Sequence, residues 1–486
     1  QFSKGRVEVR PLLRWETEKR VQRTFADSLL PQSLQFYDLN PALKVSIGEF
    51  SIEAGLGYRE NKRPFDNHLE NESISRSQRF ALNYRPSSSF STSNRLQFRQ
   101  KKTDDLFLES AISPRSKGVL MSSITSFDLL DGELDGELFY ETNTERRALL
   151  QETYIEVGPE LGQYIWIDLN DDNIEQIDEF FPEVTPNEGI YIRQFVPSDN
   201  LEPVIDVTFR FRHEIGLGKL FERIGASTVE SLQHLNWSSL FEIQETSRED
   251  DLSRVYLLHS SVLRDAETSI NGRRIIRQRL SWRTDDRHTE LAFAFNDSRS
   301  LIQRSVGVQT GSDQVISFDL EQQLSRPLRL LTTVQRSDLT NDNSRFASRT
   351  YSINGFDLRP GISYFINRSA QVELRTGYSH KQSESPAGTA TATTYSVENR
   401  ARLFLFERIQ NRLRLQLRHT DVKGNVAGQA EYELTEGIGR GTNVVWSLNS
   451  DYRASSLLRI SLQYNGRTTG RSEIIQTLRF VVSAVF

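Results

Sequence analysis

The sequence predicts an all-β protein, a transmembrane antiparallel β-barrel of roughly 18 to 22 strands with long extracellular loops. Three observations predict this class. Apolar and polar residues alternate with period two in many segments, many of these segments have about ten residues, and short connections alternate with long polar ones. The sequence contains no apolar run of about 18 residues, which excludes transmembrane helices.

The alternation is clear at residues 205–212. Ile205, Val207 and Phe209 share one face of an extended chain, whereas Asp206 and Arg210 lie on the other. The same pattern predicts strands around residues 52–58, 291–295, 316–320, 328–334, 372–378, 412–418, 443–452, 458–465 and 474–486. Short connections are expected at Arg85, Arg326, Asn367 and Arg453, and long ones at 61–75, 104–117, 149–202 and 247–272.

Alternation alone does not decide which face meets water. A soluble β protein would bury the apolar face, whereas a membrane barrel turns it to lipid and its charged face to the lumen. The strand length and the Trp and Tyr residues near the ends of the apolar stripes favour the membrane barrel. The predicted lumen-facing residues are Arg210, Arg212, Arg277, Arg279, Arg283, Arg329, Arg375, Arg412, Arg414, Arg418 and Arg459, with Glu53, Glu290, Asp319, Glu321 and Glu373.

These charged residues allow two interpretations. They could pair across neighbouring strands and stiffen a wide barrel, or they could form an electropositive conduit that selects anions. We prefer pairing, because opposed carboxylates cancel much of the field. The net charge is −5 and no Cys is present, so disulfides and thiolate metal sites are excluded. The first ten residues have no apolar core typical of a signal peptide, so we expect a mature chain or the C-terminal part of a longer one.

One segment is strongly acidic. Residues 152–202 contain 13 Asp and Glu but only one basic residue, Arg193. This concentration predicts an acidic extracellular insert at 149–202, within a single outer-membrane barrel that covers 1–486. The mildly basic remainder does not predict nucleic-acid binding, which needs a basic surface.

The insert contains a spacing typical of an EF-hand calcium loop at 168–179. Asp168, Asn170 and Asp172 occupy positions one, three and five, Ile174 supplies the backbone carbonyl at seven, and Glu179 stands at twelve. Position six needs a sharp turn and usually holds Gly, and here it holds Asn173, which tolerates the left-handed conformation. The preceding "YIWI" predicts a strand, so the site is not helix–loop–helix. We expect a structural calcium ion here; a solvated acidic turn without an ion is the alternative.

Two stretches resemble known proteins. The last strand, with Phe486, Ala484, Val482, Phe480 and Leu478 at alternate positions, resembles the C-terminal assembly signature of Gram-negative outer-membrane proteins. The segments "GQYIWIDLNDDNIEQIDEF", "YIRQFVPSDN" and the closing hairpins resemble large outer-membrane β-barrel proteins of Bacteroidota. This resemblance implies a location in the bacterial outer membrane and contact with its lipid. It names no substrate.

No catalytic motif is evident. The seven His residues form no H-E-x-x-H pattern, and there is no G-x-S-x-G or P-loop. Asp285, Asp286 and His288 cluster at one turn, which is better explained as a hairpin tip. We therefore expect a non-enzymatic conduit or scaffold in outer-membrane transport, secretion or surface assembly. The alternatives are a plugged anchor whose loops hold a partner protein and, less favoured, a barrel hydrolase.

Overall fold

The computed structural model describes most of the chain, in two compact units. The undescribed residues are 1, 5–6, 11–12, 19–20, 23–27, 31, 108–114, 160, 219, 221–233, 250–251, 257, 260–262, 285–287, 306, 407, 456, 469–473 and 485–486. The first unit comprises Gln1–Arg147, Glu202–Ile215 and Leu240–Gly272. The second comprises Ala148–Leu201, Gly216–Ser239 and Arg273–Phe486. The prediction of a single barrel over 1–486 stays a prediction.

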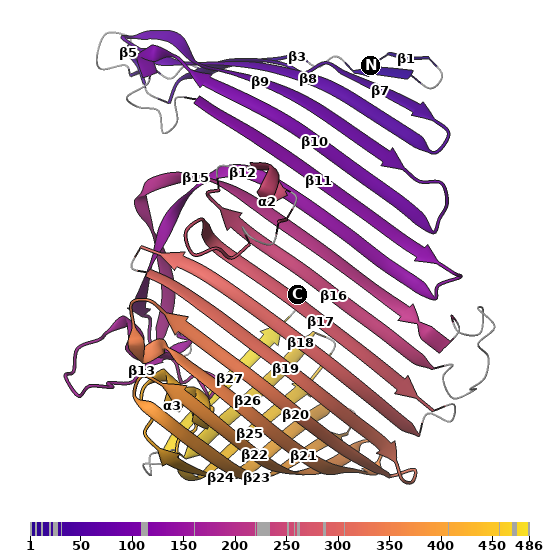
Figure 1. Cartoon of the computed structure of the whole chain (residues 1–486), viewed down its shortest axis with the longest axis vertical. Helices are drawn as coiled ribbons and strands as arrows, with labels where there is room; N and C mark the ends of the chain where they lie inside the picture. Colours follow the sequence, from indigo (N-terminus) through magenta and orange to yellow (C-terminus); the bar gives the residue numbers. More distant parts are fainter. Residues whose placement is uncertain are drawn as a thin grey trace. The chain divides into compact units, whose positions relative to one another are not determined.

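The first unit is a sheet of paired hairpins (Figure 1). Its elements are β1 (Phe2–Lys4), β2 (Val7–Arg10), β3 (Leu13–Glu18), β4 (Val21–Gln22), β5 (Ser28–Leu29), β6 (Leu34–Leu39), β7 (Ala42–Ile47), β8 (Phe50–Phe65), β9 (His68–Tyr84), β10 (Phe90–Thr103), η1 (Asp105–Phe107), β11 (Arg115–Leu129) and α2 (Leu252–Tyr256). Four strands contain residues of both units: β12 (Leu134–Glu156), β15 (Tyr191–Gly216), β16 (Leu235–Ser247) and β17 (Ser269–Arg283). The described pairings are antiparallel, in the order β1–β2–β7–β8–β9–β10–β11–β12.

The β8–β9 hairpin corrects one sequence prediction. The sequence predicts a long loop at 61–75, but β8 and β9 pair up to Phe65 and His68, with one register shift between Asn61 and Lys62. Only Asp66 and Asn67 form the turn, with φ of 44° and 63°. Two successive left-handed residues are typical of a type I′ turn, which matches the twist of a hairpin, and Asp and Asn tolerate that conformation.

The second unit is a meander of long strands. Its elements are β13 (Tyr164–Trp166), η2 (Ile177–Glu179), β14 (Phe180–Pro182), β18 (Thr289–Arg304), β19 (Gly307–Gln323), β20 (Leu328–Asn343), η4 (Ala347–Arg349), β21 (Tyr351–Asn367), β22 (Ala370–Ser385), β23 (Gly388–Leu405), β24 (Ile409–Gly424), α3 (Gln429–Thr435), β25 (Gly441–Arg453), β26 (Leu458–Thr468) and β27 (Ile474–Ala484). Strands β18 to β27 pair antiparallel in chain order. The sheet curls, so that β25–β27 lie behind β18–β20 in Figure 1.

The predicted all-β class and antiparallel pairing are confirmed. Among the described residues, eighteen strands have eleven residues or more, within the predicted range. Several are longer than predicted: β19 and β21 each have 17 residues. At about 3.4 Å per residue such a strand exceeds a hydrocarbon core of about 30 Å even when tilted. The extra length arises because the polar ends of the strands continue to pair beyond the apolar stripe.

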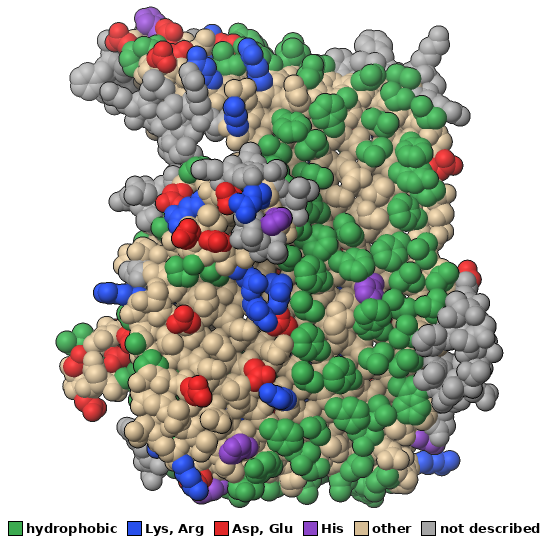
Figure 2. Space-filling model, viewed as in Figure 1, with side chains coloured by type: hydrophobic (Ala, Val, Ile, Leu, Met, Phe, Trp, Pro, Cys, Tyr) green, Lys and Arg blue, Asp and Glu red, His purple; other side chains and the backbone are tan. Residues whose placement is uncertain are grey.

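The two faces of the second unit's sheet differ in chemistry. We call the face that contacts α3 the inner face and the opposite face the outer face. On the outer face of β24, Leu413, Leu415 and Leu417 are 45%, 49% and 50% exposed, whereas Arg418 on the inner face is 4% exposed. Figure 2 shows hydrophobic side chains gathered over β18–β20 and, in the first unit, over β8–β11. The apolar face is therefore the one that the chain itself leaves uncovered.

The helices that the structure describes are short. Among the described residues, none of the helices combines the length and the apolar character that crossing a membrane requires. Short connections occur where the sequence predicts them, at residues 85–89, 324–327, 368–369 and 454–457. The terminal Phe486 and its neighbour lie outside the described residues.

Candidate functional site

Two segments of the second unit pack on its inner face and define the candidate site. We call residues 157–190 the insert and residues 425–440 the α3 segment. The strands extend into the predicted insert, because β12 ends at Glu156 and β15 begins at Tyr191. The insert contacts residues far away in the chain: Ser348 donates to the Asp178 carboxylate at 2.6 Å, and Thr477 donates to the Pro186 carbonyl at 2.8 Å.

The insert is held by a small aromatic core of its own. Strand β13 pairs with β14 and with the start of β15, as the "YIWI" pattern predicts. Phe180 stacks on Tyr154 with ring centroids 4.1 Å apart, and it meets Tyr191 edge to face. Phe181, which is 2% exposed, packs against Tyr432 of the α3 segment at 4.9 Å. These contacts fix the insert against the α3 segment and against the adjoining ends of β12 and β15.

The predicted calcium turn adopts the expected sharp bend. Asn173 has φ of 57°, so the left-handed position falls where an EF-hand loop needs it. The Asp168 carboxylate accepts the backbone N–H groups of Asp172 at 3.3 Å and of Asn173 at 2.8 Å. Asn170 Oδ1 accepts Asp172 N–H at 3.0 Å, and Ile174 is 62% exposed. Asp168, Asn170 and Asp172 thus place carboxylate and amide oxygens around one exposed turn, which is chemistry that suits a hard cation.

Glu179, the predicted twelfth ligand, is placed differently. Its side chain is buried, and its Oε2 accepts Trp166 Nε1–H at 2.9 Å while its Oε1 accepts Leu169 N–H at 3.1 Å. Gln176 N–H also donates to Oε2, at 3.3 Å. Both oxygens therefore already bind N–H donors, and Glu179 as placed does not fit the role of a bidentate ligand. Among the residues that the structure describes, no group of three or more acidic or His side chains is arranged to hold a metal ion. Calcium at 168–179 stays a prediction.

Helix α3 covers the inner face at one end of the strands. Ala430 and Leu434, four residues apart on one side of the helix, are buried. They pack with inward-facing apolar residues, and the whole cluster consists of Tyr351, Ile353, Ala390, Ala392, Val426, Ala430 and Leu434. The chain then turns at Glu436, in the left-handed conformation, and at Gly437. A Cβ at Gly437 would collide with Val184 and Tyr432, so glycine permits the insert to approach.

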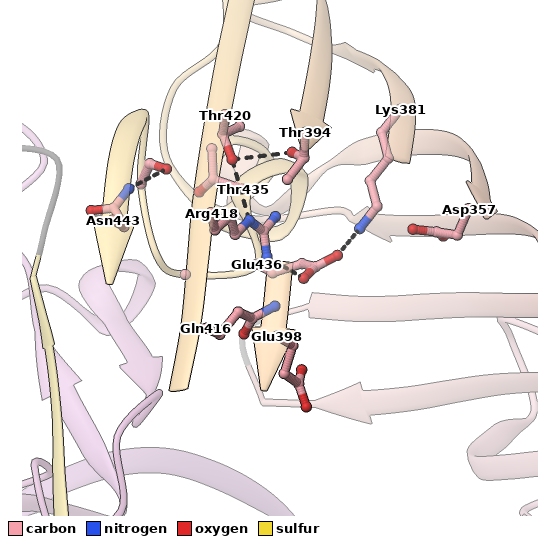
Figure 3. A network of polar contacts seen from close by, with 12 residues as sticks. Asp357, Lys381, Thr394, Glu398, Gln416, Arg418, Thr420, Thr435, Glu436 and Asn443 are labelled. Atoms are coloured by element: carbon pink, nitrogen blue, oxygen red, sulfur yellow. Dashed lines mark hydrogen bonds and ion pairs between the residues drawn. The ribbon is translucent and has the colours of Figure 1, made fainter. Parts of the chain in front are cut away.

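Glu436 anchors the α3 segment to the strands electrostatically. Its carboxylate lies 2.6 Å from Lys381 Nζ of β22 and 2.5 Å from Arg418 Nη1 of β24 (Figure 3). Arg418 Nε also donates to Thr420 at 3.2 Å. Burial raises the pKa of Glu436, but the two cations outweigh it and lower the pKa to about 2. The carboxylate is therefore ionised at neutral pH and paired with two cations.

A buried network also joins the insert to the strands. Glu152 of β12, which is 3% exposed, forms ion pairs with Arg304 of β18 and Arg349 of η4. Tyr154 donates to the same carboxylate at 2.6 Å. Arg349 also donates to the carbonyl of Ile177 in the insert. These residues are far apart in the chain, so no local sequence pattern predicts this network.

A cavity of about 900 Å³ lies between the insert and the α3 segment. Its wall is largely aromatic and aliphatic and also includes two ion pairs, Glu188–Arg467 and Glu431–Arg440. The lining residues are Ile165, Trp166, Ile167, Leu169, Phe181, Glu188, Ile190, Tyr191, Gly428, Glu431, Tyr432, Thr435, Gly437, Ile438, Gly439, Arg440, Arg467 and Ile475. The size suits an organic molecule or a short peptide segment. The weak catalytic candidates Asp285 and Asp286 lie outside the described residues.

Comparisons with known proteins give structural neighbours only. No protein-family model matches the chain, and no curated protein matches it. The siderophore receptor PirA from Pseudomonas aeruginosa aligns with a TM-score of 0.41 and 8% identity, over 100% of this chain and 76% of that chain. The outer membrane transporter YddB from Escherichia coli aligns with a TM-score of 0.32 and 8% identity, over 100% and 81%. The copper transporter OprC aligns with a TM-score of 0.36 and 8% identity, over 98% and 75%.

Proposed function

We propose that this chain is a non-enzymatic β-barrel of the bacterial outer membrane that takes part in transport across it. The single observation that carries the proposal is the outer face of the second unit's sheet. There Leu478, Phe480 and Val482 of β27 are 62%, 63% and 54% exposed. A water-soluble protein does not leave so continuous an apolar band uncovered, whereas lipid covers such a band at no cost.

The opposite face supports the same proposal. Neighbouring strands carry ion pairs such as Arg329–Glu321 at 2.6 Å and Arg459–Asp451 at 3.0 Å on the inner face. Such residues need water or partners, so the inner face would line a wet lumen. In this proposal the insert and the α3 segment stand inside one end of the conduit. The insert would be extracellular, and calcium would stiffen its exposed turn.

A second candidate is a closed anchor that holds a partner protein at the cell surface. The observation that favours it is the packing of the insert and the α3 segment on the inner face, since both reduce the space for passage. In that case the insert would contact the partner and the strands would serve only to hold it in the membrane.

Two measurements test the proposal. The detergent-extracted protein is compared on SDS gels before and after boiling, because a closed membrane barrel resists SDS until heated. It is then reconstituted into planar bilayers for conductance. A heat-dependent shift with conductance supports the conduit, and a shift without conductance supports the anchor. No shift, together with solubility in buffer without detergent, would contradict a membrane barrel.

A further inference from the structure

We propose that the inner face of β22–β24 binds a small multivalent oxyanion, a phosphate or a polycarboxylate, at a row of arginines. The row consists of Arg400, Arg402, Arg412, Arg414 and Arg418, and we call it the arginine ladder. The inference depends on the proposed function in one respect, because water must reach the inner face for a solute to bind there.

The register of β23 and β24 places arginine opposite arginine. In the β23–β24 pair, Arg400 lies directly opposite Arg414, and Arg402 lies directly opposite Arg412. Opposed like charges destabilise a sheet, so two such rungs in succession are unfavourable unless something neutralises them. Opposite Cα atoms lie about 5 Å apart, and alternate residues along a strand lie about 7 Å apart. Four guanidinium groups can therefore converge on one ion.

The inner face around the ladder carries more positive than negative charge. On the inner face of β21–β24, together with Glu433 and Glu436 of the α3 segment, eight basic side chains face five acidic ones, a net formal charge of +3. The basic residues are Arg359, Arg375, Lys381, Arg400, Arg402, Arg412, Arg414 and Arg418, and the acidic ones are Asp357, Glu373, Glu398, Glu433 and Glu436. The carboxylates are shared: Glu398 pairs with both Arg400 and Arg414, and Glu436 pairs with both Lys381 and Arg418.

Two guanidinium groups of the ladder lack a close carboxylate partner. Within the described part of the chain, Arg402 and Arg412 form no ion pair, and both are exposed on the inner face, although the charge of Arg412 interacts with Asp451 of β25. Arg414 Nε is buried and has no hydrogen-bond partner among the described residues. Guanidinium groups prefer planar, bidentate oxyanions, and a phosphate or carboxylate would supply the missing acceptors.

Two cavities are lined by residues of the arginine ladder. A cavity of about 210 Å³ is lined by Arg400, Arg402, Arg412 and Arg414, with Glu373 at its side. A second cavity of about 240 Å³ shares Arg400 and Arg414 with it and continues to Arg418. Each volume holds a diphosphate or a small polycarboxylate. The ladder thus leads along the inner face from the β23–β24 turn towards the network of Figure 3.

The test is calorimetric titration of the heat-modifiable, detergent-solubilised protein with inorganic pyrophosphate and, separately, with citrate. The double variant R402Q/R412Q removes the two unpaired guanidinium groups. The matched control R283Q/R329Q removes the same charge at two paired positions away from the ladder. We expect saturable binding to the natural protein, an affinity at least about tenfold weaker in R402Q/R412Q, and a change of less than about twofold in the control.

Three results would overturn the site: no saturable binding of either probe, equal loss in both double variants, or no loss in R402Q/R412Q. Binding of only one probe identifies that class as the ligand. If R402Q/R412Q does not fold, the natural protein is treated with phenylglyoxal instead, and pyrophosphate or citrate should protect Arg402 and Arg412 but not Arg329. Anion binding without conductance would contradict the conduit and leave the site intact, so the two proposals fail separately.

Discussion

Arg467 Nη2 lies 2.7 Å from Glu188 Oε1, and both side chains are buried, at 4% and 9% exposure. The two residues are 279 positions apart in the chain, and the pair joins β26 to the insert. Arg467 also donates to the Gly437 carbonyl at 2.7 Å, so one guanidinium contacts both segments that cover the inner face. The pair also lines the large cavity.

Substituting Glu188 with Gln should loosen the insert. The change leaves the Arg467 guanidinium buried without a counter-charge, which typically costs about 3–5 kcal/mol. We expect amide hydrogen exchange across residues 157–190 to accelerate by about a hundredfold or more, since 1.4 kcal/mol is about tenfold. Exchange in β19 and β20 should not change.

The control for this prediction is Arg459→Gln. Arg459 pairs with Asp451 on the same face, but its side chain is 60% exposed, so its loss should cost less than about 1 kcal/mol. Equal acceleration of the insert in the two variants would show that the burial of the Arg467–Glu188 pair is unimportant.

Acid should release the α3 segment within a defined pH window. The folded-state pKa of Glu436 is lowered to about 2, below the ordinary value of 4.5. A lowered pKa means that the carboxylate stabilises the fold above pH 4.5, and that this stabilisation is lost as pH falls from about 4.5 towards 2. We expect pepsin cleavage within residues 425–440 to rise over that range, relative to an unstructured reference peptide.

The variant Glu436→Gln provides the comparison. It cannot ionise, so its α3 segment should already be cleaved readily at pH 5, and the rate relative to the reference should stay flat as pH falls. A steep rise in this variant, matching that of the natural protein, would assign the acid response to another group.

Calcium binding at 168–179 can be tested by luminescence of terbium, a calcium substitute, excited through Trp166. We expect a signal that calcium displaces and that Asp168→Asn weakens by about tenfold or more, because it removes one charged ligand. Asp171→Asn is the matched control: it removes the same charge from the same turn at a position that is not a ligand. Equal weakening by both changes would indicate a diffuse acidic attraction rather than a calcium site.

The same experiment decides the role of Glu179. Its carboxylate receives N–H groups from Trp166, Leu169 and Gln176, so as placed it supports the turn rather than a metal ion. Glu179→Gln should then reduce the stability of the insert more than terbium affinity. A loss of terbium binding with the insert's hydrogen exchange unchanged would instead make Glu179 a ligand.

The sequence predicts the strands of this protein better than their connections. Period-two alternation within a segment predicts both the strand and its apolar face. The residues of β24 and β26 are therefore sufficient to predict these two strands. The turn at Asp66 and Asn67 was missed because polar strand ends resemble a loop in composition. The Asp–Asn dipeptide between two alternating segments was the available signal for a hairpin.

The candidate site was harder to predict, for a physical reason. Helix α3 has a weak local signal, Ala430 and Leu434 four residues apart between Gly428 and Gly437, and seven residues give little periodicity. No local sequence signal predicts the ion pairs Glu152–Arg349 and Glu188–Arg467. The residues of each pair are far apart in the chain, and only the curl of the sheet brings them together. The alternation of charged residues predicts pairing across neighbouring strands, whereas the placement of arginine opposite arginine on β23 and β24 follows only from the register.

Two neighbouring residues of β24 test which face of the sheet meets lipid. Leu415 lies in the middle of β24 on the outer face, and Gln416 follows it on the inner face. In a bilayer, Leu415→Arg places a charge in hydrocarbon near the midplane and should destabilise the folded protein by about 2–4 kcal/mol. Gln416→Arg adds the same charge to a wet face directly opposite Glu398, with Arg414 and Arg418 on either side, and should cost less than Leu415→Arg does. Urea titration of folding into lipid vesicles measures both changes. If the sheet instead packed its apolar face into a soluble core, Leu415→Arg would prevent folding in detergent-free buffer as well. If Gln416→Arg were the more damaging change, the assignment of inner and outer faces would be reversed.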